Sequence, residues 1–287
     1  MSNLVYLSGE LVAYEDAKIH VEDRGFQFAD SVYEVMAVYQ SQVVDREVHY
    51  ARLERSLMEL EIAAPMPRSE LDSIVHDLIQ RNGMESGNIY IQISRGVAPR
   101  HHSFPEPAPK PTVVIMTKPC VFPYPEEVAY RAEKVITLPD IRWGRRDIKS
   151  VNLLANCMAM TEAERAGAYD AILFEPDGSV TEASASSAWI VTHDGEVLTR
   201  ALSNQILPGT CRGTTLKIAQ AEGMKIREQT FSVDQMKSAA EVFLSGTTPM
   251  INPVGQVDDV VIGDGQCGPI TRRLLALFRE RVFGLNS

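Results

Sequence analysis

Three prolines fall within the short stretch KPCVFPYPEE, residues 118–127, and this stretch divides the chain more sharply than any other feature. Proline fixes φ and has no N–H to donate, so helices and strands end near it, and a stretch rich in proline is a semi-rigid connection. A chain of 287 residues is long enough for two modest domains. We therefore predict an N-terminal domain over residues 1–118, a linker over 119–128 and a C-terminal domain over 129–287.

Strand-like and helix-like patterns are mixed on both sides of this stretch. Alternating or β-branched segments predict strands at Leu4–Leu7, Glu10–Ala13, Ser31–Tyr39, Ile89–Arg95, Thr112–Thr117, Tyr130–Thr137, Ala171–Glu175, Ala188–Thr192 and Glu241–Ser245. Apolar residues spaced by three and four predict helices at His49–Ile62, at Glu70–Gln80 with Ser69 as its N-cap, at Leu153–Ala166, at Cys211–Glu222, from about Val233, and at Gly268–Arg281. Because the order has no regular βαβ rhythm, we predict an α+β fold with two domains.

Charge and cysteine usage exclude several classes of protein. The formal net charge is −10, from 28 basic and 38 acidic residues, which disfavours binding to the phosphate backbone of a nucleic acid. The four cysteines are far apart and form no C-x-x-C pair, which favours reduced thiols in a cytoplasmic protein. The six histidines show no metal-ligand spacing, and no apolar stretch is long enough to cross a membrane. We expect a cytoplasmic protein with no metal site.

Four stretches carry the chemistry, and they occur in a fixed order along the chain. They are DRGFQF at residues 23–28 with VYEV at 32–35, SRGVAPRHH at 94–102, DIKS at 147–150, and VTEASASS at 180–187. Together with Leu207-Pro208-Gly209 downstream, they resemble the fold-type IV pyridoxal-phosphate enzymes, which include the branched-chain and D-amino acid aminotransferases. The resemblance extends over the whole chain and implies pyridoxal 5'-phosphate as the cofactor.

Lys149 and Glu182 are the two residues to which this resemblance assigns the central chemistry. A lysine is required because only a primary amine forms a Schiff base with the cofactor aldehyde and is then released to act as a base. The resemblance places Glu182 beside the pyridine nitrogen, where a negative charge keeps that nitrogen protonated. Judged by its own neighbours, Arg145-Arg146-Asp147, Lys149 would be an ordinary lysine of a charged surface loop.

The cofactor phosphate requires hydrogen-bond donors, and the sequence offers several. Arg52 matches the phosphate arginine of the family, and the resemblance also assigns cofactor contacts to Leu207, Gly209, Thr210, Cys211, Thr247 and Thr248. Thr210 would open a helix, and the start of a helix presents N–H groups to an anion. Cys211 stands where the enzymes it resembles have a threonine, which removes a hydroxyl and keeps the backbone amide. The alternatives are a helix-face ion pair for Arg52 and a plain turn for the two threonines.

The stretch RGVAPRHHSFP, residues 95–105, indicates the substrate. It resembles the loop of D-amino acid aminotransferases that holds the substrate carboxylate, which assigns this role to Arg100 and His102 with Tyr33 as their partner. Arginine suits the role because its planar fork pairs with both carboxylate oxygens. The resemblance also implies that the loop reaches the active site of the neighbouring subunit of a homodimer. The alternative interpretation is a solvated basic loop.

We therefore predict transamination between a D-amino acid and a 2-oxo acid, of the D-alanine and 2-oxoglutarate type. Other fold-type IV activities remain alternatives: a branched-chain L-amino acid transaminase, an (R)-amine transaminase or an aminodeoxychorismate lyase. A different class of alternative is a non-catalytic protein that only binds the cofactor. The presence of Lys149, Glu182 and Arg52 together argues against that last interpretation.

Overall fold

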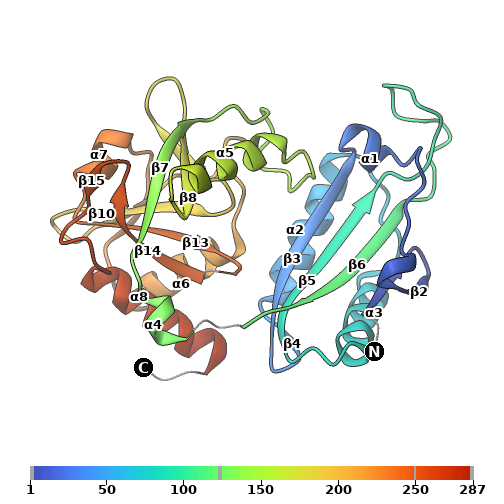
Figure 1. Cartoon of the computed structure of the whole chain (residues 1–287), viewed down its shortest axis with the longest axis horizontal. Helices are drawn as coiled ribbons and strands as arrows, with labels where there is room; N and C mark the ends of the chain where they lie inside the picture. Colours follow the sequence, from blue (N-terminus) through green and yellow to red (C-terminus); the bar gives the residue numbers. More distant parts are fainter. Residues whose placement is uncertain (1–2, 122–124, 249, 285–287) are drawn as a thin grey trace. The chain divides into compact units, whose positions relative to one another are not determined.

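The computed structural model describes residues 3–121, 125–248 and 250–284 (Figure 1). The chain forms two compact units. Unit 1 contains Met1–Phe122 and Ile148–Asn152, and unit 2 contains Pro123–Asp147 and Leu153–Ser287. The predicted linker, 119–128, includes residues 122–124, which lie outside the described residues. Within the linker and just beyond it, α4 (Glu126–Ala129) forms a single helical turn.

Unit 1 contains an antiparallel sheet whose strands are in the order β2-β1-β6-β5-β3-β4. The strands are β1 (Leu4–Leu7), β2 (Glu10–Ala13), β3 (Ser31–Tyr39), β4 (Gln42–Val43), β5 (Ser86–Ser94) and β6 (Thr112–Pro119). In β5, Ile89, Ile91 and Ile93 are fully buried because alternate residues of a strand point to the same face. That alternation is the pattern from which the strand was predicted.

Helices of unit 1 pack against this sheet. They are α1 (Arg24–Phe28), α2 (Arg46–Glu59) and α3 (Arg68–Arg81), and unit 1 also has the 3-10 turn η1 (Tyr14–Asp16). Helix α2 packs against β3, and α3 packs against β1 and β6. The predicted N-cap Ser69 is wrong, because α3 already begins at Arg68. Pro67 precedes it with φ −59° and ψ 148°, an extended conformation that a proline ring favours.

Unit 1 also includes the short segment that carries Lys149. The N–H of Tyr33 donates to the carbonyl of Lys149 at 2.9 Å, and the N–H of Val151 donates to the carbonyl of Ser31 at 3.0 Å. These bonds hold Ile148–Asn152 beside the start of β3. The segment thus lies in unit 1, whereas the predicted division assigned it to the C-terminal domain. Position along the chain did not reveal this pairing, because it joins residues more than a hundred positions apart.

Unit 2 contains a nine-stranded mixed sheet in the order β12-β11-β10-β13-β14-β7-β8-β9, with β15 paired to β14. The strands are β7 (Glu133–Pro139), β8 (Asp170–Phe174), β9 (Val180–Ala183), β10 (Ser187–Val191), β11 (Val197–Thr199), β12 (Ile226–Glu228), β13 (Glu241–Gly246), β14 (Met250–Val257) and β15 (Val260–Val261). Several strands are buried along their whole length, including β9, β10 and β13. Strand β14 was not predicted, because Asn252 and Pro253 interrupt its β-forming residues.

Four helices accompany this sheet in the described part of unit 2 beyond α4. They are α5 (Leu154–Arg165), α6 (Thr210–Ala221), α7 (Val233–Lys237) and α8 (Pro269–Phe283). Helix α5 packs against β7 and β8, while α6 and α8 contact each other and β13. The predicted helices agree with these bounds within three residues at each end where an end was predicted. Each unit therefore has its own sheet and its own core.

Candidate functional site

Lys149 in unit 1 lies beside an aromatic pair. Its Nζ atom is 4.1 Å from the centre of the Tyr33 ring, and that ring stacks on Tyr90 with a centroid distance of 5.8 Å. The backbone N–H of Lys149 donates to the Ser56 hydroxyl of α2 at 3.3 Å. The side chain is half-buried rather than fully exposed. Two predicted site residues, Lys149 and Tyr33, are thus brought into contact by the pairing of the 148–152 segment with β3.

Arg52 forms a buried ion pair. Its Nε and Nη2 atoms donate to the two carboxylate oxygens of Glu34 at 2.7 and 2.8 Å. The Nδ1 atom of His49, one turn earlier on α2, is 2.8 Å from the same carboxylate. Glu34 is completely buried and Arg52 is 7% exposed. The helix-face ion pair that the sequence offered as an alternative for Arg52 is therefore present, but it lies in the interior.

The charges of this cluster determine its protonation. Burial by itself would raise the pKa of Glu34, but the Arg52 charge and the hydrogen bonds from Arg52 and His49 lower it to about 2. Burial lowers the pKa of His49, so its imidazole is neutral near pH 7. The cluster consequently holds one negative and one positive charge. Part of the Arg52 charge is already compensated before any anion approaches.

Arg100 and His102 lie in the loop between β5 and β6, residues 95–111, and both side chains are exposed. The loop's two ends meet at Gly96, which has φ +105°, and a Cβ there would lie 2.1 Å from the carbonyl oxygen of Lys110. Only a glycine permits that approach. The Arg100 guanidinium carbon is 5.0 Å from the centre of the Phe28 ring, and the His102 ring packs edge-on to Phe28 at 5.7 Å.

Glu182 lies on β9 in unit 2 and is buried. Its Oε1 atom accepts from Nη1 of Arg142 at 2.6 Å, and the backbone N–H of Leu207 is 3.2 Å from both carboxylate oxygens. Arg142 also donates to both oxygens of Asp140, at 3.0 and 2.7 Å. Burial raises the pKa of Glu182, while Arg142 acts against it. Among the described residues, the Oε2 atom accepts only the 3.2 Å bond from the Leu207 N–H, which it shares with Oε1, so it can accept a further hydrogen bond.

The start of α6 and a turn after β13 contain the remaining predicted residues. Gly209 is the N-cap of α6 and Thr210 and Cys211 are its first residues. A Cβ at Gly209 would lie 3.0 Å from the Ser187 hydroxyl oxygen, so a larger residue there would crowd Ser187. The Cys211 thiol donates to the carbonyl of Met250 at 3.1 Å. Thr247 and Thr248 are partly buried in the turn that follows β13.

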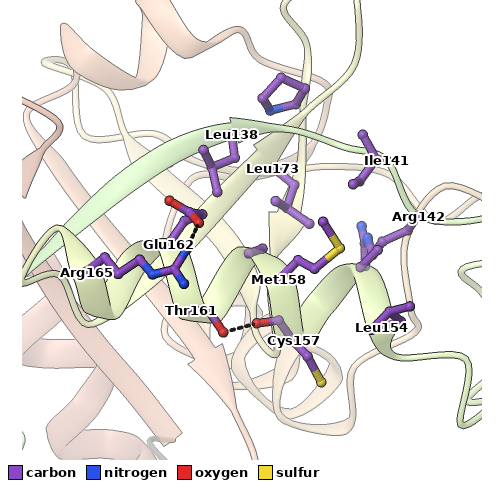
Figure 2. Close-up of a pocket in the computed structure, with 13 residues that line it drawn as sticks. Leu138, Ile141, Arg142, Leu154, Cys157, Met158, Thr161, Glu162, Arg165 and Leu173 are labelled. Carbon is purple, nitrogen blue, oxygen red and sulfur yellow. Dashed lines mark hydrogen bonds and ion pairs between the residues drawn. The ribbon is translucent and has the colours of Figure 1, made fainter.

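A cavity of about 490 Å³ lies over α5 in unit 2 (Figure 2). Its lining is mostly apolar and includes Ile141, Leu154, Met158 and Leu173. Figure 2 shows Leu154 and Met158 on α5, Leu173 on β8, and Ile141 in the segment that follows β7. None of the predicted site residues lines it, although Arg142, the ion-pair partner of Glu182, does. The cavity is therefore not the predicted cofactor position.

Several partners of the predicted residues were missed. Arg142 forms ion pairs with both Glu182 and Asp140. Glu34 forms an ion pair with Arg52, and the Phe28 ring contacts Arg100. Nothing in their sequence spacing identified these contacts, since they join different elements. A charged residue inside a strand that is otherwise apolar, such as Glu34 in SVYEVMAVY, is the one signal that was available.

Metal-ligand clusters and membrane-spanning helices are both absent from the described part of the chain. Within the described ranges, no group of three or more histidine, cysteine, aspartate or glutamate side chains is arranged to hold a metal ion. Among the helices of those same ranges, none is both long and apolar enough to cross a bilayer. The four cysteines, all among the described residues, are not joined in disulfide bonds.

Comparisons with known proteins agree on one family. The family model described as amino-transferase class IV matches residues 31–257. The D-alanine aminotransferase of Staphylococcus haemolyticus is 36% identical over 283 residues, covering 99% of both chains. The D-alanine aminotransferase of Listeria monocytogenes serotype 4b (strain F2365) is 37% identical over 279 residues, covering 97% of this chain and 96% of the other.

Solved structures show the same relationship. A branched-chain amino acid aminotransferase of Escherichia coli superposes with a TM-score of 0.91 at 27% identity, covering 100% of this chain and 97% of that one. A branched-chain amino acid aminotransferase from T.th., solved with pyridoxamine 5'-phosphate, superposes with a TM-score of 0.90 at 26% identity, covering 99% and 95%. The α+β fold predicted from the sequence is confirmed.

Proposed function

The chain belongs to the class IV aminotransferases, and we propose that within this family it transfers the amino group of a D-amino acid to a 2-oxo acid. The cofactor is pyridoxal 5'-phosphate, as in the family as a whole. The observation that carries the proposal is the contact between Lys149 and Tyr33, with Nζ 4.1 Å from the ring centre. It joins the lysine expected to react with the cofactor to a residue expected to bind the substrate.

The residues fit this cofactor in their donor and acceptor chemistry. Glu182 offers a buried carboxylate whose Oε2 can accept one more N–H. Gly209 lies at the start of a helix whose first N–H groups attract anions, and its lack of a Cβ avoids a 3.0 Å contact with the Ser187 hydroxyl oxygen. When bound, pyridoxal phosphate supplies an aldehyde for the amine and a ring that accepts electrons from the carbon losing its proton.

Lys149 is proposed to act as both attachment point and base. Its primary amine would hold the cofactor through the aldehyde, and the freed amine would accept on Nζ the proton lost by the substrate Cα. The Tyr33 ring contacts Nζ on one side and restricts where the amine can move. A restricted amine delivers the proton from one direction only, which is what a stereospecific reaction requires.

Glu182 is proposed to accept a hydrogen bond from the protonated pyridine nitrogen. Arg142, itself paired with Asp140, holds the carboxylate through Oε1 and opposes the effect of burial on the Glu182 pKa. The Leu207 N–H contacts both oxygens and limits rotation of the group. These partners orient Oε2 and keep a negative charge available where the pyridine proton needs it.

The phosphate is proposed to bind through Arg52, the Gly209–Cys211 backbone, Thr247 and Thr248. Since Glu34 already compensates part of the Arg52 charge, the N–H groups at the start of α6 are expected to carry a large share of the binding.

Arg100, His102 and Tyr33 are proposed to hold the substrate carboxylate. An exposed guanidinium and imidazole on one loop supply hydrogen-bond donors, and a hydroxyl adds a third. By the resemblance, the loop serves the neighbouring subunit of a homodimer. A cytoplasmic location is also proposed, in keeping with four cysteines that form no disulfide bonds.

A panel of amino donors tests the function. The holoenzyme is given D-alanine with 2-oxoglutarate, and L-leucine or an (R)-amine with 2-oxoglutarate or pyruvate, and the 2-oxo product or ketone is measured. We expect turnover of D-alanine. Turnover of L-leucine alone would overturn the proposal and support a branched-chain enzyme, the activity named for the superposed structures. Turnover of the (R)-amine alone would also overturn it.

A further inference from the structure

We propose that Phe28 and Arg24 of the DRGFQF segment are positioning residues for the substrate-carboxylate loop. The inference deepens the proposed function and rests on it. The loop residues concerned are three in a row, Arg100, His101 and His102. Each of the three is contacted by a residue of the short helix α1.

Phe28 contacts both predicted carboxylate ligands. The Arg100 guanidinium carbon lies 5.0 Å from the ring centre, within the range of a cation–π interaction. The His102 ring meets the same ring edge-on, with 5.7 Å between centroids and 68° between planes. One aromatic ring therefore restricts two side chains that are otherwise exposed to solvent.

Arg24 holds the loop backbone between Arg100 and His102. Its Nη1 atom donates to the carbonyl of His101 at 2.7 Å, and its Nε atom donates to Asp30 at 2.7 Å. Its guanidinium carbon is also 4.8 Å from the centre of the Phe28 ring. Arg24 is 3% exposed, so its fork is fixed from several directions. A buried, fully oriented donor fixes a loop carbonyl more firmly than an exposed one does.

Another arginine, Arg95, holds the loop through contacts that do not involve Phe28. Arg95 donates to both oxygens of Asp30, and its guanidinium carbon lies 3.6 Å from the centre of the Phe104 ring. Asp30 thus links Arg24 and Arg95 at the two sides of the loop. With the backbone held by these arginines, Phe28 determines where the side chains of Arg100 and His102 point. Without the ring, the side chains of Arg100 and His102 lose their fixed orientation, whereas the loop backbone keeps its path.

The test is Phe28→Leu, with Phe26→Leu as matched control. Both residues are phenylalanines of α1, but Phe26 is 77% exposed. We expect Phe28→Leu to raise KM for the D-amino acid about fivefold to tenfold, the loss of one or two such ring contacts, with a smaller change in kcat. Phe26→Leu and Phe28→Tyr should stay within about twofold of the parent protein, because Tyr keeps the aromatic face.

Limited trypsin digestion gives a readout independent of activity. Trypsin cleaves after Arg100, and freeing that side chain from Phe28 should raise the rate of cleavage at Arg100 in Phe28→Leu but not in Phe26→Leu. Unchanged KM and unchanged cleavage in Phe28→Leu would overturn the inference. If Arg100→Ala leaves KM unchanged, the proposed carboxylate role fails instead. Faster cleavage in Phe28→Leu would still show that Phe28 restrains the Arg100 side chain.

Discussion

The amine nitrogen of Lys149 lies 4.1 Å from the centre of the Tyr33 ring, although the two residues are far apart in the sequence. The contact follows from backbone pairing, since the Tyr33 N–H donates to the Lys149 carbonyl at 2.9 Å. A lysine held against an aromatic face has fewer orientations than one in a solvated loop. This relationship separates Lys149 from the ordinary surface lysine that its charged neighbours indicated.

Lys149→Ala should abolish transamination and the yellow colour of the bound cofactor. The alanine has no amine to react with the aldehyde, whereas the exposed Lys18 should be replaceable by alanine without loss. Absorbance of the purified proteins measures the colour. In the parent protein, borohydride should fix the cofactor to the tryptic peptide containing residue 149. Attachment at any other lysine would refute the assignment.

Two substitutions at Tyr33 should separate the contribution of its ring from that of its hydroxyl. Tyr33→Phe keeps the ring under Lys149 and removes the hydroxyl, so KM for the D-amino acid should rise about tenfold while cofactor incorporation is unchanged. Tyr33→Leu removes both and should also slow the development of colour when the cofactor is added to cofactor-free protein. Equal effects of the two substitutions in both assays would show that the hydroxyl alone matters.

Glu182→Gln should lower kcat by about a hundredfold or more, because the amide keeps the size of the group but removes the charge opposite the pyridine nitrogen. The parent carboxylate is held by Arg142 at 2.6 Å and by the Leu207 N–H. Steady-state kinetics measures the effect, and KM should change far less than kcat. Glu175→Gln, a change to another glutamate of unit 2, is the control. A kcat close to that of the parent would remove Glu182 from the mechanism.

Arg100→Ala should raise KM for a D-amino acid by about tenfold to a hundredfold, the loss of a charged hydrogen bond. The affinity for the cofactor should not change. His101→Ala is the matched control in the same loop, because its backbone carbonyl, which accepts from Arg24, is retained. Weaker cofactor binding in Arg100→Ala, with KM unaltered, would assign the residue to the phosphate instead.

Glu34 should make the stability of the protein depend on pH. Its pKa in the folded protein is about 2 against an ordinary value of 4.5, because Arg52 and His49 outweigh the effect of burial. The stabilisation is therefore complete above pH 4.5 and is lost as the pH falls from 4.5 toward 2. At about 1.4 kcal/mol per pKa unit, this amounts to about 3 kcal/mol.

At pH 7, Glu34→Gln should accordingly have a lower free energy of unfolding than the parent protein. At pH 3, the difference in free energy of unfolding between the two proteins should be smaller. Urea unfolding at the two pH values measures both. Glu54→Gln removes a carboxylate that pairs with Arg68 at the exposed surface, and it should change stability little. A constant difference between Glu34→Gln and the parent across this pH range would contradict the pKa assignment.

Local patterns were sufficient for most of the fold and for the family. β-Branched and aromatic residues predicted β3, and three- and four-residue spacing predicted α2, because such signals arise within a single element. The order of the four motifs was sufficient to identify the class IV aminotransferases, a resemblance that the comparisons bear out. Strand β14 was missed because burial, and not local propensity, stabilises it.

The tertiary structure alone decided which charges are compensated and by what. The pairing of Arg52 with Glu34, of Glu182 with Arg142, and of Arg24 with the His101 carbonyl each joins different elements. An isolated sequence segment does not encode such partners, since the pKa of a carboxyl or the orientation of a guanidinium depends on what folding buries beside it. The sequence determined the chemistry that Lys149 is able to perform. Folding determined that its amine is held against Tyr33.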